Sequence, residues 1–314
     1  MNRMAPRRLV ALALQWMAVK EGAILLVDEV EHALEPHRLR HLLRVLREAP
    51  GEGRGQVLLT THSSVAIEEL SADELLCVRS ENGITTIKRV SSDLQALVRD
   101  EPEAFLARRV LVCEGKTELG LCRGLMSFWA EMHEGLPFAH TGTALAVGQG
   151  SLSPKRALQL ARLDYKTALF ADSDKPLDPD PAALGRNGVT VIQWSGNVAT
   201  EERVALDLPW SSLQGFLDAL IEVRGEESAL SAVGSALLGG RAPAGASLDS
   251  WRDQGLGEED IRRALGQAAK HTKALKRVEL GEQLASVVGP VLPTIAESDL
   301  AAKLAQVAAW CYGD

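Results

Sequence analysis

The stretch Val110-Leu111-Val112-Cys113-Glu114-Gly115-Lys116-Thr117-Glu118 decides the fold of the larger part of this 314-residue chain. An unbroken apolar run ends there in an acid, as in strands buried on both faces of a parallel sheet. Another apolar run, residues 167–171, ends in Asp172-Ser173-Asp174. Ligands of open α/β sheets bind at the carboxyl ends of the strands. If these two strands are neighbours in the sheet, as we expect, four carboxylates meet at one sheet edge: Glu114, Glu118, Asp172 and Asp174.

So many like charges repel one another unless a cation neutralises them. Ligation by oxygen atoms alone favours Mg²⁺, Mn²⁺ or Ca²⁺. A glycine-rich turn with Gly148 and Gly150 lies between the two acidic motifs. The alternative is that the acids are solvated helix caps, but two acidic strand ends in this order are harder to explain that way.

The surrounding pattern alternates between helix and strand, which favours an α/β fold with a parallel sheet. Helices are predicted over residues 117–132 and 154–162, and a further strand over 189–194. From about residue 200 strand signals nearly vanish, and Ala, Leu, Glu and Arg dominate. This helical part is expected to be inserted into the second α/β unit or appended to it.

A first, smaller α/β unit precedes residue 96. The apolar strand 23–27 should be buried on both faces, and it ends in Asp28-Glu29. A helix follows from Pro36, and a second buried strand, residues 57–60, leads into Thr61-His62. Asn82-Gly83 between two β-rich runs predicts a hairpin.

Composition places the chain among ordinary globular proteins with a net charge of −8. The four cysteines form no metal-binding spacing and resemble reduced, buried thiols, so a cytoplasmic location is expected. The apolar residues 9–19 after Arg7-Arg8 are too short to span a bilayer and lack a cleavage site, so they predict a buried helix and no membrane partner.

The first unit resembles part of the ATPases related to the ABC family. Asp28-Glu29 matches the Walker B element, where one acid holds Mg²⁺ and the next orients the attacking water, and His62 matches the switch histidine. No GxxxxGK[ST] phosphate loop occurs in the chain. The chain is therefore either a C-terminal fragment or a degenerate relative, and ATP is expected only with the missing phosphate-loop half. A purely structural strand–helix unit is the alternative.

The second unit resembles the Toprim fold of topoisomerases, primases and related nucleases, in which the Glu and the DxD motif bind the catalytic metal. The order of the two units resembles the OLD (overcoming lysogenisation defect) family of nucleases. The resemblance implies an ATPase part over residues 1–96, a Toprim core over 106–202, a helical insertion over 203–268 and a return to Toprim over 269–314. It also implies metal-dependent cleavage or nicking of DNA, often in antiphage defence.

The same resemblance implies further site residues. Either Glu201 or Glu202 would supply another metal ligand. In the basic segment 270–277, Lys276 would stabilise the transition state, with Lys273 as second choice, although Ala274-Leu275 replaces the aromatic pair usual before that lysine. A solvated helix face is the ordinary alternative for such a charge run.

The expected reaction is phosphodiester hydrolysis with two Mg²⁺ or Mn²⁺ ions. Expected partners are DNA, a second copy through the ATPase part and a helicase. Arginines of the predicted helix after Pro36 could add DNA contacts, or face a partner or solvent. A topoisomerase is disfavoured because Tyr165 and Tyr312 lie in no recognisable tyrosine-bearing module. The alternative function is a dimerising ATPase-type regulatory module whose Toprim site is inactive without a partner.

Overall fold

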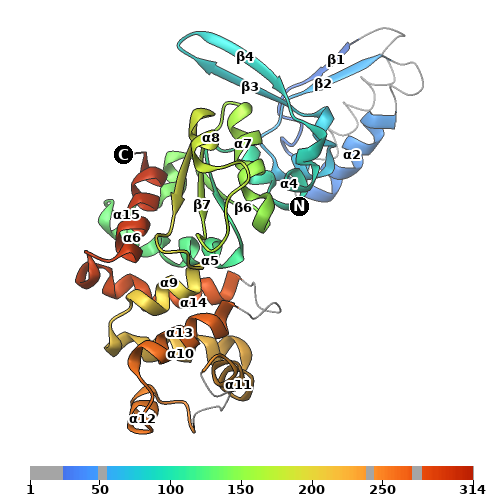
Figure 1. Ribbon diagram of the computed structural model, residues 1–314. Helices are drawn as coiled ribbons and strands as arrows, with labels where there is room; N and C mark the ends of the chain where they lie inside the picture. Colours follow the sequence, from blue (N-terminus) through green and yellow to red (C-terminus); the bar gives the residue numbers. More distant parts are fainter. Residues whose placement is uncertain (1–23, 49–54, 238–243, 271–277, 314) are drawn as a thin grey trace. The chain divides into compact units, whose positions relative to one another are not determined.

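The computed structural model describes residues 24–48, 55–237, 244–270 and 278–313 (Figure 1). The predicted helix over 9–19 and the lysines Lys273 and Lys276 lie outside the described residues. The chain divides into two compact units, Met1–Ala107 and Arg108–Asp314. Each unit has its own hydrophobic core.

The first unit is built on two parallel strands, β1 (Ile24–Val27) and β2 (Gln56–Leu59), with Leu25 opposite Val57. Helix α2 (Pro36–Glu48) packs against them because its leucines recur at helical spacing and bury one face. The strands β3 (Leu76–Glu81) and β4 (Ile84–Arg89) form the predicted antiparallel hairpin, and its turn residues Asn82 and Gly83 both have positive φ.

Short helices complete this unit. They are α3 (Ser64–Glu69), α4 (Gln95–Asp100) and the 3-10 turns η2 (Ala72–Glu74), η3 (Ser92–Leu94) and η4 (Pro102–Phe105).

The prediction that both strands are buried on two faces was wrong. Ile24 is 57% exposed, Leu26 72% and Leu58 52%. Side chains alternate along a strand, so one set contacts α2 while this other set points away from it. The apolar run correctly indicated a parallel strand, but it did not reveal whether another element packs on the second face of that strand.

The second unit contains a four-stranded, all-parallel sheet in the order β6-β5-β7-β8. Its strands are β5 (Arg109–Cys113), β6 (Thr143–Val147), β7 (Lys166–Ala171) and β8 (Val189–Gln193). The predicted pairing of β5 with β7 is confirmed, with Cys113 opposite Phe170. Strand β6, on the other side of β5, was not predicted from the sequence.

Helices of this unit connect the strands. The single helix predicted over 117–132 consists of two, α5 (Lys116–Gly124) and α6 (Met126–Met132), divided at Leu125. Helix α7 (Ser153–Arg162) leads into β7, and α8 (Pro181–Arg186) leads into β8. Cys113, Cys122 and Cys311 are buried free thiols, whereas Cys77 in the first unit is only half-buried.

The part after residue 200 is helical, as expected. It comprises α9 (Thr200–Asp207), α10 (Trp210–Arg224), α11 (Glu226–Ala236), α12 (Leu248–Asp253), α13 (Glu258–Lys270), α14 (Val278–Val288), the 3-10 segment η8 (Gly289–Ile295) and α15 (Asp299–Tyr312).

Two of these helices bring the end of the chain back to the sheet domain. Helix α14 packs on α5 at backbone distance, since a Cβ added to Gly120 would lie 2.0 Å from the carbonyl oxygen of Val278 (Figure 1). In α15, the carbonyl oxygen of Cys311 accepts a hydrogen bond from Thr143 Oγ1 at 2.7 Å, next to β6. The described residues after 200 therefore share one continuous core with the sheet.

Candidate functional site

The carboxyl ends of β5 and β7 form the base of the candidate site. Glu114 follows β5 directly, and its N–H donates to the carbonyl oxygen of Phe170 at 2.8 Å. Its carboxylate Oε2 accepts a hydrogen bond from the N–H of Asp172, the first residue after β7, at 2.9 Å. The two acidic strand ends are thus tied to each other directly.

Glu118 lies in the first turn of α5 and is only 3% exposed. Its Oε2 accepts the N–H of Gly115 at 2.7 Å, which satisfies one free amide of the helix N-terminus. Burial, reinforced by the like charges of Glu201 and Glu114, raises the pKa of Glu118 to about 7. The surroundings of the Glu118 carboxylate therefore disfavour its charged form.

Asp172 is held by the start of α9. Its Oδ1 accepts the N–H of Thr200 at 2.7 Å and the Thr200 hydroxyl at 2.8 Å. That hydroxyl in turn accepts the indole N–H of Trp194 at 2.7 Å. Burial and the charges of Glu118, Glu201 and Glu114 nevertheless raise the pKa of Asp172 to about 9.

Glu201, the next residue of α9, completes the group. It is 8% exposed, and its Oε1 accepts the hydroxyl of Thr117 from α5 at 2.8 Å. We call this group the acidic tetrad: Glu114, Glu118, Asp172 and Glu201. The sequence left the choice between Glu201 and Glu202 open, and the structure places Glu201 in the tetrad.

Asp174 and Glu202 lie together on the ammonium group of Lys270. The Lys270 Nζ is 3.1 Å from Asp174 Oδ2 and 2.9 Å from Glu202 Oε2. Although partial burial lowers the pKa of Lys270, hydrogen bonds to both carboxylates raise it overall. The strand-end acids were expected to converge at one point, but Asp174 pairs with a lysine instead. Sequence reasoning assigned no role to Lys270, and its place in the basic segment was the available signal.

The glycine-rich turn lies against the same strand end. The N–H of Gly148 donates to Cys113 O and that of Gly150 donates to Glu114 O, each at 2.7 Å. A Cβ added to Gly148 would come within 2.2 Å of Ser153 Cβ, so only glycine fits there. The turn therefore supports the backbone that carries Glu114.

The tetrad has the chemistry of a divalent-cation site but is not arranged around one. Among the described residues, no three His, Cys, Asp or Glu side chains are set to hold a single metal ion. The tetrad carboxylates instead accept bonds from backbone amides and threonine hydroxyls. Carboxylate oxygens suit Mg²⁺ or Mn²⁺, and a cation would offset the burial and the neighbouring like charges that raise the pKa values of Glu118 and Asp172.

The motif residues of the first unit lie at the ends of β1 and β2. Asp28 Oδ1 accepts the hydroxyl of Thr60 at 2.6 Å, and this hydroxyl accepts the N–H of Glu29 at 2.9 Å. The N–H of His62 donates to Glu31 at 2.7 Å. Glu31 was missed by the sequence analysis. Asp28, Glu29 and His62 are exposed, in contrast to the tetrad.

The arginines of α2 pair with acids of the same unit. Arg40 contacts Glu68 at 2.9 Å, Arg44 contacts Glu69 at 2.9 Å and Arg47 contacts Glu74 at 2.8 Å. Their charges are therefore already balanced within the first unit.

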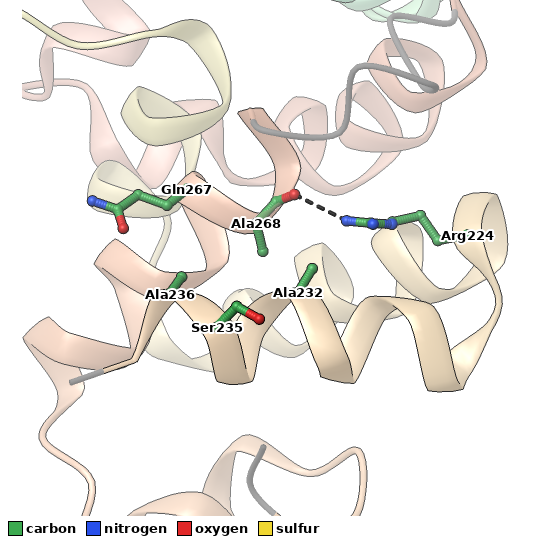
Figure 2. Close-up of a pocket in the computed structure, with 6 residues that line it drawn as sticks. All are labelled: Arg224, Ala232, Ser235, Ala236, Gln267 and Ala268. Atoms are coloured by element: carbon green, nitrogen blue, oxygen red, sulfur yellow. Dashed lines mark hydrogen bonds between the residues drawn. The ribbon is translucent and has the colours of Figure 1, made fainter. Parts of the chain in front are cut away.

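A cavity of about 360 Å³ lies among α10, α11 and α13, and none of its described lining residues is a predicted site residue (Figure 2). Arg224, Gln267 and small side chains line it. Arg224 Nη1 donates to the carbonyl oxygen of Ala268 at 3.1 Å, in the last turn of α13. This bond supports the turn that carries Lys270.

The match to a protein family lies at the beginning of the chain. A family model described as "AAA domain, putative AbiEii toxin, Type IV TA system" matches residues 7–68. This match indicates an ATPase-type fold for that part and includes Asp28, Glu29 and His62. No curated protein matches the chain. Within the described residues, no helix is both long and apolar enough to cross a membrane.

Proposed function

We propose that this chain is a metal-dependent DNA endonuclease or nickase of the OLD type, which hydrolyses phosphodiester bonds at the acidic tetrad. The observation that carries the proposal is the gathering of four carboxylates, two buried and two half-buried, around the ends of two adjacent parallel strands. If the acids only capped separate helices, they would not need to lie close together. Perturbed carboxylates gathered at one place are typical of functional sites.

The tetrad, with Asp174 and Glu202 beside it, would hold two Mg²⁺ or Mn²⁺ ions. Such ions activate a water and stabilise the leaving 3′ oxygen of a phosphodiester. Thr117 and Thr200 orient the carboxylates of Glu201 and Asp172, as outer-shell donors do in metal sites. The acids hold their positions through α5, α9 and the sheet rather than through long loops.

Positive charge near the tetrad comes from the end of α13. Lys270 lies there, and the basic segment 270–277 follows with Lys273 and Lys276. By the resemblance to OLD proteins, Lys276 or Lys273 would offset charge on the pentavalent phosphate. DNA is the proposed substrate. Its binding should be modest because the chain carries a net charge of −8, and it should weaken with salt because contacts of lysine with phosphate release counterions.

The ATPase-type unit would regulate this activity. Asp28 and Glu29 would serve Mg²⁺-bound ATP only together with a phosphate loop, which the sequence does not contain. Self-association through this unit and cooperation with a helicase belong to the same proposal.

The test is cleavage of supercoiled plasmid in Mg²⁺, Mn²⁺ or EDTA. Glu118→Gln and Asp172→Asn each replace an ionisable carboxyl group by a neutral amide while keeping shape and most hydrogen bonds. Glu131→Gln, on the exposed side of α6, makes the same chemical change elsewhere. The proposal expects metal-dependent nicking by the wild type and Glu131→Gln, and its loss in the two tetrad variants. Intact plasmid with every protein and metal would count against it and favour the regulatory-module alternative.

A further inference from the structure

The lysine at the end of α13 joins two acids that the sequence assigned to metal. Asp174 comes from the end of β7 and Glu202 from the first turn of α9, and Lys270 Nζ lies within 3.1 Å of both. All three side chains are largely shielded from solvent: 15% exposed for Asp174, 19% for Glu202 and 28% for Lys270. The contact is therefore less screened than an ordinary surface ion pair.

The packing of α13 on α9 builds this contact. Gly266, one turn before Lys270, lies directly on Glu202, since a Cβ at Gly266 would come within 2.8 Å of Glu202 Cα. The hydrogen bond from Arg224 Nη1 to Ala268 O holds the same turn (Figure 2). Two contacts of the α13 backbone thus position Lys270.

We propose that Lys270 is an internal counter-cation, whose ammonium group occupies the cation position at Asp174 and Glu202 until a divalent ion displaces it. This inference rests on the proposed function. It follows from the division of the predicted ligands into the tetrad, held by amide and hydroxyl donors, and a pair that shares a lysine, in which Glu202 Oε2 also accepts the N–H of Ala199. A divalent ion and an ammonium group cannot both lie between the same two carboxylates.

The consequence is that Lys270 and a second divalent ion compete for the same two carboxylates. With Lys270 in place, Asp174 and Glu202 carry one net negative charge between them, and they carry two when it leaves. Removing the lysine should strengthen binding of a divalent ion at this pair by about tenfold, which corresponds to about 1.4 kcal/mol. Binding at the tetrad should change much less.

The first experiment is calorimetric titration of Mn²⁺ into the full chain. Lys270→Gln removes the charge, Lys270→Arg retains it, and Lys155→Gln breaks a matched exposed pair with Asp178. The weaker of two binding steps should tighten about tenfold in Lys270→Gln and stay near the wild-type value in the other two. An equal second affinity in wild type and Lys270→Gln would overturn the inference.

A second experiment needs no variant and therefore does not depend on refolding. Amine-directed labelling of the wild type, quantified by mass spectrometry, should modify Lys270 severalfold faster with Mg²⁺ than with EDTA. Lys155 serves as the internal reference. Unchanged labelling of Lys270 at a Mg²⁺ concentration shown by calorimetry to saturate the chain would contradict displacement.

The outcomes separate this inference from the proposed function. Two-ion binding that does not respond to Lys270 would leave the nuclease proposal standing and remove the counter-cation role. No binding of Mn²⁺ by either wild type or Lys270→Gln would remove both.

Discussion

The carboxylate of Glu114 accepts the backbone N–H of Asp172 across the ends of two adjacent strands, at 2.9 Å between Oε2 and N. Each of these residues immediately follows a strand whose register is fixed by the sheet. The distance between the two acids is therefore set by strand spacing rather than by loop conformation. This is the geometry in which like charges remain close even though they repel.

Neutralising a tetrad acid should stabilise the metal-free protein. Asp172→Asn keeps an acceptor for Thr200 and removes the cost of holding Asp172 protonated at pH 8, which arises because burial and three neighbouring acids raise its pKa to about 9. Its free energy of unfolding in EDTA at pH 8 should rise by about 1–3 kcal/mol, since one pKa unit corresponds to about 1.4 kcal/mol. Urea denaturation measures this change. A clear loss of stability would contradict the electrostatic account.

The metal-free protein should lose stability as pH rises from about 5 to about 9. The folded-state pKa values of Glu118 and Asp172, about 7 and about 9, lie above their ordinary values. The folded state therefore binds more protons than the unfolded state over this range, and unfolding becomes easier as pH increases.

Thermal unfolding from pH 5 to pH 9, in EDTA and in saturating Mg²⁺, tests this dependence. Mg²⁺ should flatten it, because bound metal replaces the protons. The same slope in both buffers would argue against metal binding at these acids.

The glycine-rich turn should respond differently at its two glycines. Gly148→Ala places a methyl group 2.2 Å from Ser153 Cβ, so the turn must shift and stability should fall by about 1–3 kcal/mol or more. Gly150→Ala meets no atom within 4 Å but keeps φ at 66°, which costs about 1 kcal/mol. Denaturation of both variants checks the predicted order of their stabilities, and nicking is measured in parallel. Equal effects would mean that packing against Ser153 does not fix the turn.

Thr200 should contribute to both stability and metal binding, although its side chain is neutral. Thr200→Val removes a donor to Asp172 and leaves the buried indole N–H of Trp194 without its acceptor. Stability should fall by about 1–3 kcal/mol, and Mn²⁺ affinity should fall as the Asp172 carboxylate loses its support. Thr190→Val, exposed on β8, is the control. Identical Mn²⁺ titrations for the two variants would exclude a role for Thr200 in orienting Asp172.

The sequence predicted the elements whose apolar runs have a definite end. The strands before Glu114 and Asp172 and the hairpin at Asn82-Gly83 were all found, and the pairing of β5 with β7 is confirmed. Strand β6 was missed because Thr143–Val147 contains two alanines and only one β-branched apolar residue, so its strand signal is weak. The division at Leu125 was missed because apolar periodicity continues through it.

The partners of the acids could not be predicted in the same way. Whether Asp174 faces the tetrad or Lys270 depends on how α13 packs on α9, and this packing depends on a single glycine, Gly266. The exposure of Leu26 likewise depends on what covers the second face of the strand. Strand and helix periodicities report one face of one element, whereas these features arise between elements distant in the sequence.

The most direct test of the central claim is to ask what ends the nicked DNA carries. Plasmid nicked by the chain in Mn²⁺ is incubated with DNA ligase and ATP and examined on a gel, with Asp172→Asn treated in parallel. Hydrolysis with a leaving 3′ oxygen predicts nicks that ligase reseals, formed by the wild type and not by Asp172→Asn. Plasmid left uncut by the wild type, or nicks that form equally with Asp172→Asn, would contradict phosphodiester hydrolysis at the acidic tetrad.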